Sequence, residues 1–331
     1  MGKATVFYKL PGLNEIVKKT GIINPELKPI AFDNINEDLF LFSPYNNKNL
    51  AYHITLQNNI SKFEIIAYST NKNNHFDSEQ EFLAKTNKAI KTMQEMPEFG
   101  KVVFGRCENQ NLDGEIDINT YFLNLCINYP NSFVYAVSSA VTGTWIAATP
   151  ELLLNTNYSI INTIALAGTM LNSSTAKWGE KEIDEQHKVA FFINEIAHKN
   201  NLTKISENGP SDLLTGHLKH LCTYFSFQYD QNKIAHFIAE LNPTPAVGGL
   251  PKKTANEFIK QNENLERKFY TGFVGIMNKK ETTLFVNLRC MELFKNKLHL
   301  YAGCGITKNS DANAEWQETS NKLAILRKYL P

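Results

Sequence analysis

A short tract rich in proline and glycine constrains this chain more than any other segment. Residues 241–251 read LNPTPAVGGLP, with three prolines and two glycines between two helical patterns. Proline fixes φ and removes a backbone donor, whereas glycine permits positive φ. A segment this rigid predicts a shaped loop, and shaped loops often line binding sites. A plain connection between two helices is an equally good explanation from these residues alone.

Composition limits the classes of protein to which the chain can belong. Its 331 residues are 43% hydrophobic and 20% charged, which is typical of a soluble globular protein. The formal net charge is +1, so no long-range field selects nucleic acid or an anionic membrane. No apolar run approaches a membrane span, and no glycine-rich phosphate-binding pattern follows a strand. We expect a small-molecule ligand, no nucleic acid and no membrane.

The cysteines indicate the compartment. There are five, and no two are spaced as a zinc site or a redox pair requires. An odd number of scattered cysteines argues against a disulfide framework and for a reducing environment. We expect a cytoplasmic protein that acts as a monomer.

Hydrophobic periodicity predicts an α+β protein. Helical patterns cover residues 78–96, 182–198, 212–220, 234–240, 254–261 and 311–329, with Ser310 as the N-cap of the last. Strand patterns cover residues 101–106, 132–141, 145–149, 152–155, 160–166, 273–277, 283–293 and 297–302. Runs of strands broken by single helices are not a βαβ repeat, which indicates the α+β class.

Two glutamate pairs are candidate metal ligands. Glu182 and Glu185 are three residues apart, as are Glu315 and Glu318, so each pair lies on one face of a helix. The first pair continues an apolar stripe, where an unpaired carboxylate is costly and a hard divalent cation would offset the charge. Spacing alone favours the alternative, in which both pairs are solvated or joined to lysines.

Arg289 is a candidate anion-binding residue. It interrupts residues 283–293, which are apolar on both faces of the predicted strand. A guanidinium in such surroundings requires an anionic partner, and a bidentate carboxylate is the natural one. That carboxylate belongs either to a ligand or to an internal Asp or Glu.

Several segments in a fixed order resemble one enzyme family. After the proline-rich tract come FYTGFVG at 269–275, LRC at 288–290, YAGCGI at 301–306 and EWQET at 315–319. This series resembles the C-terminal half of the chorismate-utilising enzymes, which include isochorismate, salicylate and anthranilate synthases. The resemblance covers residues 99–330, and residues 1–98 match poorly. It implies one α+β domain over residues 1–331, with two large antiparallel sheets packed face to face and helices outside.

The resemblance assigns a metal and a catalytic pair. Family members carry a Lys-[Asp/Glu]-x-x-Glu-His segment where this chain has KEIDEQ at 181–186, so Gln186 replaces the usual His. By carry-over, Glu185 and Glu318 bind Mg²⁺ directly, whereas Glu182 and Glu315 act through metal-bound water. The family's Lys-Val-Val strand and Ser-Pro-Glu turn match Lys101 and Glu151. Those two become the general base and the general acid; without the resemblance they would be unconnected residues.

The same carry-over predicts the substrate contacts. Tyr270, Arg289, Tyr301 and Gly303 are expected at the side-chain carboxylate of chorismate, and Gly168 and Thr169 at its ring carboxylate. The remaining expected contacts are His217, Ala246 and Val247. Asn242 replaces the histidine that usually precedes Pro-Thr-Pro.

These features favour a function as an Mg²⁺-dependent isochorismate synthase. A lysine base implies that water, not ammonia, adds to the ring. The reaction would add water at C2 and remove the C4 hydroxyl, for menaquinone or siderophore biosynthesis. Two alternatives stay open: a salicylate synthase, which also releases pyruvate, and a non-catalytic protein that binds chorismate.

Overall fold

The computed structural model describes residues 1–31, 35–70, 74–157, 159–216, 218–229 and 234–330. The helices in these ranges are α1 (Glu79–Glu95), α2 (Ile118–Asn128), α3 (Glu180–Lys199), α4 (Ile234–Leu241), α5 (Lys252–Asn262) and α6 (Ala312–Arg327). The first nine strands are β1 (Gly2–Lys9), β2 (Val17–Ile23), β3 (Lys28–Pro29), β4 (Leu39–Ser43), β5 (Leu50–Asn59), β6 (Lys101–Asn111), β7 (Phe133–Ser139), β8 (Gly143–Thr149) and β9 (Leu152–Asn157). The others are β10 (Ile160–Leu171), β11 (Thr203–Thr215), β12 (Leu218–Gln228), β13 (Gly249–Leu250), β14 (Phe273–Met277), β15 (Glu281–Val286), β16 (Cys290–Leu293) and β17 (Lys297–Ile306).

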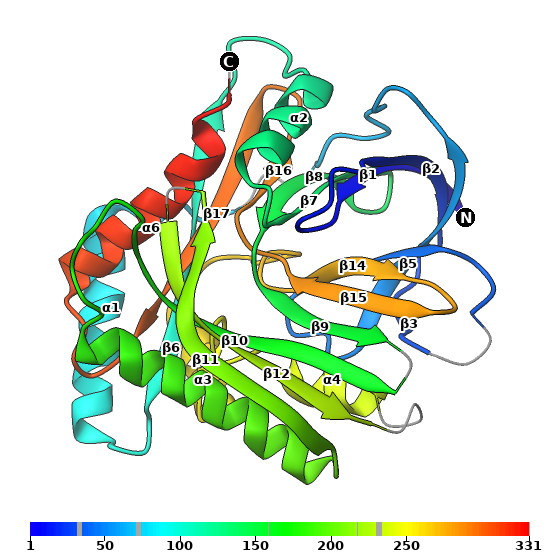
Figure 1. The fold of residues 1–331 in the computed structure, drawn as a ribbon. Coiled ribbons are helices and arrows are strands. Elements are labelled where there is room, and N and C mark those ends of the chain that lie inside the picture. Colours follow the sequence, from blue (N-terminus) through cyan, green and yellow to red (C-terminus); the bar gives the residue numbers. More distant parts are fainter. Residues whose placement is uncertain (32–34, 71–73, 158, 217, 230–233, 331) are drawn as a thin grey trace.

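The strands form two antiparallel layers that are joined at β1. One layer follows the order β2-β5-β4-β14-β15-β9-β10-β12-β11, and the other follows β7-β8-β16-β17-β6-β13. β1 pairs with β2 on one side and with β7 on the other, so hydrogen bonding continues from one layer into the next. The expected fold class, α+β with two packed antiparallel sheets, is confirmed (Figure 1).

Aromatic side chains fill the space between the layers. Phe42 and Phe269 stack at 4.0 Å, and Phe133 and Phe285 stack at 4.6 Å. Trp145, which is completely buried, contacts this cluster edge-on through Phe42. Such rings each bury a large apolar area, which is the dominant favourable term in folding. The layers are therefore held by side chains that alternate inward along facing strands.

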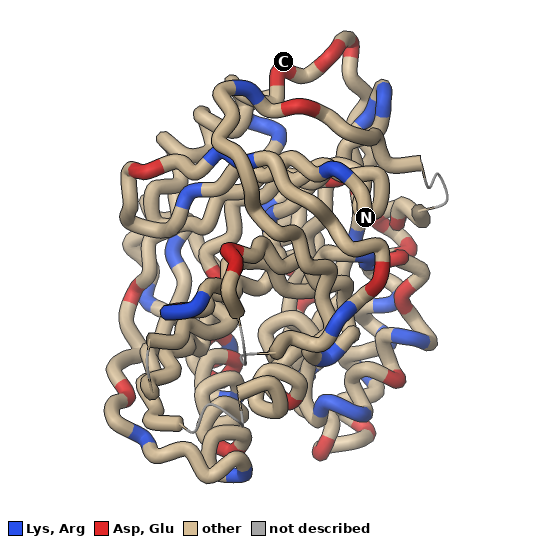
Figure 2. Tube along the Cα trace, turned by 90° about the vertical axis from the view of Figure 1, so that its right-hand side faces the viewer, with Lys and Arg blue, Asp and Glu red and all other residues tan. Residues whose placement is uncertain are grey.

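Helices cover the outer faces. α3 packs on β10 and β12, α6 packs on β17, and α1 lies beside α6 (Figure 1). No helix in the described ranges is long and apolar enough to cross a membrane. Positive and negative charges are interspersed along the chain, in keeping with its small net charge (Figure 2).

Local capping explains where two helices begin. Ser78 and Glu81 form the reciprocal capping box that the sequence predicts, with bonds of 3.3 and 2.8 Å. The predicted cap of α6 is wrong by one residue: Asp311, not Ser310, accepts the bond from the Ala314 N–H at 2.8 Å. The Ser310 hydroxyl instead accepts from the Thr307 N–H.

Two predicted elements are wrong. Residues 212–215 and 218–220 are not helical but belong to the antiparallel strands β11 and β12; β11 ends at Thr215, and Gly216 follows it at a φ of +66°. The predicted strand over residues 283–293 is two strands, β15 and β16. Arg289, at a φ of +47°, lies in the break between them. The strand predicted over residues 160–166 continues through a bulge between Ala167 and Met170.

Candidate active site

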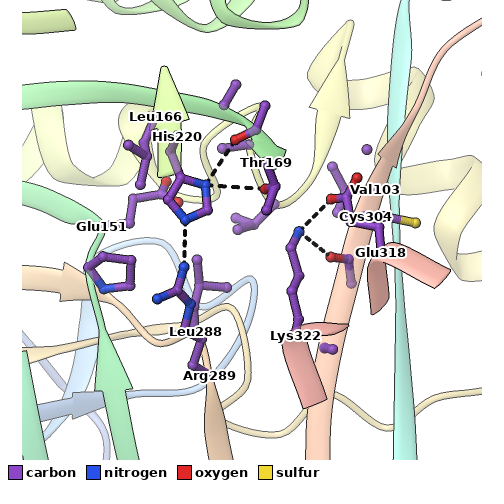
Figure 3. Close-up of a pocket in the computed structure, with 18 of the residues that line it drawn as sticks. Val103, Glu151, Leu166, Thr169, His220, Leu288, Arg289, Cys304, Glu318 and Lys322 are labelled. Carbon is purple, nitrogen blue, oxygen red and sulfur yellow. Dashed lines mark hydrogen bonds and ion pairs between the residues drawn. The ribbon is translucent and has the colours of Figure 1, made fainter. Parts of the chain in front are cut away.

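One pocket collects most of the predicted site residues. Its empty space, which is open to solvent, is about 710 Å³. β6, β10, β12, α3, β17 and α6 contribute to its wall, together with the proline-rich loop and the break around Arg289. In Figure 3, Glu151, His220 and Arg289 lie on one side, and Cys304, Glu318 and Lys322 on the other.

The proline-rich tract is a shaped loop that lines the site. Ala246 and Val247 face the pocket, and the Thr244 hydroxyl donates to Glu151 Oε1 at 3.3 Å. Lys252 Nζ donates to the carbonyls of Glu240 and Asn242, at 2.8 and 2.7 Å, and so closes the C-terminal end of α4. The tract is therefore more than a linker, since it supplies pocket residues and a partner for a buried carboxyl group.

Lys101 and Glu151 are both buried in this pocket. Lys101, on β6, is 1% exposed, and its Nζ lies 2.7 Å from Glu185 Oε1. Glu151 lies between β8 and β9, where burial raises its pKa to about 7 even though Thr244 and Lys101 act to lower it. A carboxyl group with that pKa keeps its proton in a large fraction of molecules near neutral pH. The predicted base and acid thus share one cavity.

Two of the four predicted metal ligands line the pocket. Glu185 comes from α3, and Glu318 from α6, where it pairs with Lys322 at 2.7 Å. Burial would raise the pKa of Glu185, but the ammonium groups of Lys101 and Lys181 hold it below its ordinary value. Glu185 therefore stays charged, because ammonium groups lie beside it.

The other two glutamates have different partners. Glu182 accepts a bond from the Gly179 N–H at 3.1 Å, which caps the start of α3. Glu315 Oε1 pairs with Lys181 at 2.5 Å, while its buried Oε2 has no hydrogen-bond partner in the described part of the chain. Burial and the nearby Glu318 carboxylate raise the pKa of Glu315. Neither residue lines the pocket.

The donor set suits Mg²⁺ better than a softer metal. Carboxylate oxygens are the ligands Mg²⁺ prefers, and it commonly takes only one or two from protein. Glu315 Oε2, which is buried and has no hydrogen-bond partner in the described part of the chain, is a further oxygen atom that could bind a cation. Three of these glutamates, Glu185, Glu315 and Glu318, are each paired with a lysine, however. Within the described ranges, only His75, Asp77 and Glu81 bring three ligand atoms within 4.8 Å of one another.

Arg289 has no acidic partner among the described residues. Its Nη2 donates to Thr215 Oγ1 at 3.0 Å and to His220 Nε2 at 2.6 Å, and its buried Nη1 has no partner there. Burial lowers its pKa to about 10, which leaves the group cationic at neutral pH. The internal acid that was the alternative partner is therefore not found in these ranges, and a ligand carboxylate stays as the proposed partner.

His220 is a pocket residue that the sequence interpretation missed. Arginine can only donate, so His220 Nε2 accepts from Arg289, and its proton lies on Nδ1. That Nδ1–H donates to the Gly168 carbonyl at 2.9 Å, with Thr169 Oγ1 at 3.2 Å (Figure 3). Burial and the Arg289 charge keep the pKa of His220 well below its ordinary value, so the ring is neutral.

The predicted histidine, His217, lies outside the described residues. The dipeptide His-Leu occurs twice, at 217–218 and 220–221. Lys322 was also missed, although it follows Glu318 by four residues on α6 and therefore shares its face. Its Nζ donates to the Gly303 carbonyl at 2.9 Å as well as to Glu318.

The remaining predicted contacts also line the pocket. Gly168 has a φ of +72° within the β10 bulge, and Thr169 follows it. A Cβ at Gly303 would lie 2.6 Å from the Tyr270 hydroxyl, so only glycine leaves this space open. Tyr301 contributes its ring to the pocket, because its hydroxyl already donates to Glu292 Oε2 at 2.9 Å and accepts from Asn74.

Chemically, the pocket combines anion-binding groups with a proton-transfer pair. Arg289 Nη1 and Lys322 offer positive charge, Glu185 and Glu318 offer cation ligands, and Glu151 offers a proton. This arrangement suits a small anionic substrate that must gain and lose a proton at different atoms.

A family model described as chorismate binding enzyme matches residues 45–331. Isochorismate synthase EntC of Escherichia coli (strain K12) is 29% identical over 242 residues, covering 70% of this chain and 62% of that protein. Isochorismate synthase MenF of the same strain is 27% identical over 278 residues, covering 79% and 63%. The chain thus spans less than two thirds of the length of these curated relatives.

Solved structures share the fold. A structure described as the menaquinone-specific isochorismate synthase MenF from Escherichia coli matches with a TM-score of 0.83 at 19% identity, covering 99% of this chain and 89% of that one. Anthranilate synthase component I from Streptococcus pneumoniae matches with a TM-score of 0.69 at 16% identity, covering 98% and 92%. At these identities, the likeness is one of fold.

Proposed function

This chain belongs to the chorismate binding enzyme family, and on that premise we propose that it is an isomerase that converts chorismate into isochorismate. In this reaction, water adds at C2 of the cyclohexadiene ring and the C4 hydroxyl departs as water, so atoms balance without a redox partner. The relatives named isochorismate synthases support the assignment, as does the presence of a lysine base in the pocket. The product would serve menaquinone or siderophore biosynthesis.

The proposal gives the two buried groups opposite tasks. Lys101, as the neutral amine, takes a proton from the attacking water, and Glu151 gives its proton to the C4 oxygen as the carbon–oxygen bond breaks. The ion pair with Glu185 holds the ammonium form of Lys101, so the lysine must release one proton before this step. The observation that carries the proposal is Glu151: a carboxyl group 4% exposed, with a pKa of about 7, in the same cavity as a lysine that is 1% exposed. A buried acid and a buried amine in one cavity can give a proton to one atom of a substrate and take a proton at another.

Substrate carboxylates would occupy the cationic side of the pocket. Arg289, whose Nη1 is unpartnered in the described part of the chain, would bind one carboxylate of chorismate near Tyr270 and Gly303. The other would lie near Gly168 and Thr169. Glu185 and Glu318 would hold Mg²⁺, with Glu182 and Glu315 contributing through water. The cation would supply positive charge that orients a substrate carboxylate.

The proposal also covers the cellular compartment and the oligomeric state of the protein. All five cysteines are buried and free, which is in keeping with the reducing cytoplasm. We propose that the protein acts as a monomer.

Product identification tests the proposal. Purified protein is incubated with chorismate and Mg²⁺, with and without EDTA, and products are separated by chromatography. Isochorismate that is not formed in EDTA is the expected result. Salicylate with pyruvate would instead indicate the related synthase, and absence of any product with saturating Mg²⁺ would refute an enzymatic role.

Variants test the assigned roles. Lys101→Ala and Glu151→Gln should each lower kcat at least about 100-fold, since general acid–base catalysis typically contributes ~10²–10⁴-fold. Lys9→Ala is the matched control, because Lys9 is also buried but donates to the Pro130 carbonyl, far from the pocket lining. Near-full activity of Lys101→Ala would show that the base is assigned wrongly.

A further inference from the structure

A buried ion pair behind the pocket wall has no role in the chemistry described so far. Arg267 is 4% exposed, and it lies with Glu263 between α5 and β14. Its Nε donates to Glu263 Oε1 at 2.5 Å, and its Nη2 to Glu263 Oε2 at 2.8 Å. Neither residue lines the pocket. Burying two charges is expensive, so the pair needs further contacts to be retained.

Those further contacts join two walls of the pocket. Arg267 Nη2 donates to the Val103 carbonyl on β6 at 2.7 Å, and Nη1 donates to the Val247 carbonyl in the proline-rich loop at 2.9 Å. Glu263 Oε2 also accepts from the Gly105 N–H on β6 at 2.7 Å. Val103 and Val247 are both pocket residues. A single guanidinium therefore spans from the strand of Lys101 to the loop of Thr244.

The guanidinium is suited to this task by its shape and by its surroundings. Its planar fork presents donors in fixed directions, which a lysine ammonium does not. Burial opposes the charge, but the Glu263 carboxylate holds the pKa of Arg267 above its ordinary value. The Tyr45 ring lies 4.5 Å from the guanidinium carbon and covers its face. The guanidinium consequently keeps its charge and all of its donors.

We infer that Arg267, oriented by Glu263, is a positioning residue that sets the placement of Lys101 relative to Glu151. Lys101 lies two residues before Val103 on β6, and Thr244, which donates to Glu151, lies three residues before Val247. The inference rests on the proposed function only for the identity of the reaction. The joining of strand to loop is independent of it.

A merely structural role and a positioning role predict different pH profiles. The groups around Glu151 are Thr244 in the loop, Lys101 on β6, Lys322 on α6 and Arg289, and all of them lower its pKa against the effect of burial. If the loop drifts, the Thr244 bond is lost and the pKa of Glu151 rises. Glu151 acts as an acid, so the alkaline limb of kcat/KM then moves to higher pH.

The test compares Arg267→Lys with Arg106→Lys. Arg106 is equally buried on β6, but it donates to the hydroxyls of Thr319 and Ser320 on α6 and stacks on Trp316. Both variants lose a buried guanidinium group with its hydrogen bonds, so both should be less stable to heat. Only Arg267→Lys should lower kcat, by about 10- to 100-fold. Only this variant should also shift the alkaline limb of the kcat/KM pH profile to higher pH. It should also speed hydrogen exchange at the amides of Val247 and Gly248, which bond to the Thr244 carbonyl.

The outcomes separate the two proposals. Suppose that hydrogen exchange over residues 244–250 is faster in Arg267→Lys, and that the wild-type protein makes no isochorismate. The positioning role would then be kept and the proposed reaction refuted. Unchanged exchange and an unchanged pH limb would overturn the positioning role. If Arg267→Lys does not fold, Glu263→Gln keeps the hydrogen-bonding shape but removes the charge. A smaller change in the same direction is then expected, and no change would again overturn the inference.

Discussion

Adding one methyl group at Gly305 should separate Lys101 from Glu185. Gly305 lies in β17, and a Cβ built there would lie 1.9 Å from Glu185 Oε1 and 2.7 Å from Lys101 Cε. An ordinary contact begins at 3.4 Å, so the carboxylate oxygen must move by about 1.5 Å. The ion pair between Lys101 and Glu185 is 2.7 Å long, and a displacement of that size removes its hydrogen bond.

The expected loss of activity follows from that displacement. Misplacing a catalytic group by about 1 Å can cost ~100-fold in rate, which corresponds to ~2.7 kcal/mol in the barrier. We therefore expect Gly305→Ala to lower kcat/KM for isochorismate formation at least about 100-fold. Its apparent Mg²⁺ affinity should fall as well, because Glu185 is a proposed ligand. Stability should fall by only ~1–3 kcal/mol, the usual cost of overpacking.

Gly100→Ala is the control. A Cβ at Gly100, next to Lys101, would have its nearest heavy atom at 3.7 Å, which is an ordinary contact. Steady-state kinetics against Mg²⁺ concentration and thermal unfolding would be measured for both variants. Wild-type kcat/KM in a folded Gly305→Ala protein would refute the reasoning, because it would mean that the site does not depend on the Lys101–Glu185 geometry.

Three more predictions concern single side chains. The pKa of Glu151 is raised by burial to about 7, so its carboxyl group stabilises the fold at low pH and this contribution is lost as pH rises through 7. Glu151→Gln should therefore be more stable than the wild type at pH 8, by up to ~3 kcal/mol, and equal to it near pH 5. Denaturant unfolding measures both free energies. Equal stability of the two proteins at both pH values would contradict the burial effect. Glu318→Gln should lower the apparent Mg²⁺ affinity at least about 10-fold in kinetic titrations, whereas Glu180→Gln, exposed in the first turn of α3, should leave it unchanged. Arg289→Lys should raise KM for chorismate about 10- to 100-fold, because a single ammonium cannot replace the fork that reaches Thr215, His220 and the ligand; an unchanged KM would place the carboxylate elsewhere.

The sequence predicted those parts of the fold that depend on local pattern. α1 and its capping box follow from Ser78, Glu81 and the apolar spacing, and the strands around Lys101 follow from continuous hydrophobic runs. The sequence pattern of residues 212–220 predicts a helix, and this prediction is wrong for the described residues of that segment. Antiparallel strands form there instead because β12 is paired with β10 on its other edge, a contact that local pattern does not contain.

The site was predicted mainly through segments with a recognisable order, and the gaps have physical reasons. His220 was missed because its function depends on Arg289 and Gly168, which only the folded chain brings to it. Spacing places Glu182 and Glu315 on the helix faces of the pocket carboxylates, and the resemblance implies that they act through metal-bound water, which stays a prediction. Their partners, Gly179 and Lys181, are visible only in the structure.

The pairing of early strands with late ones has a consequence for synthesis on the ribosome. β1 needs β7, β4 needs β14, and β6 needs β17, with Leu41 opposite Gly275 in the register. Loop-closure entropy opposes such distant pairings until most of the chain exists, which makes folding slow. Until then, β4 and β6 expose apolar edges that other chains can join. Yield of folded protein in the cell should therefore depend on chaperones and on temperature more than the stability of the finished molecule would suggest.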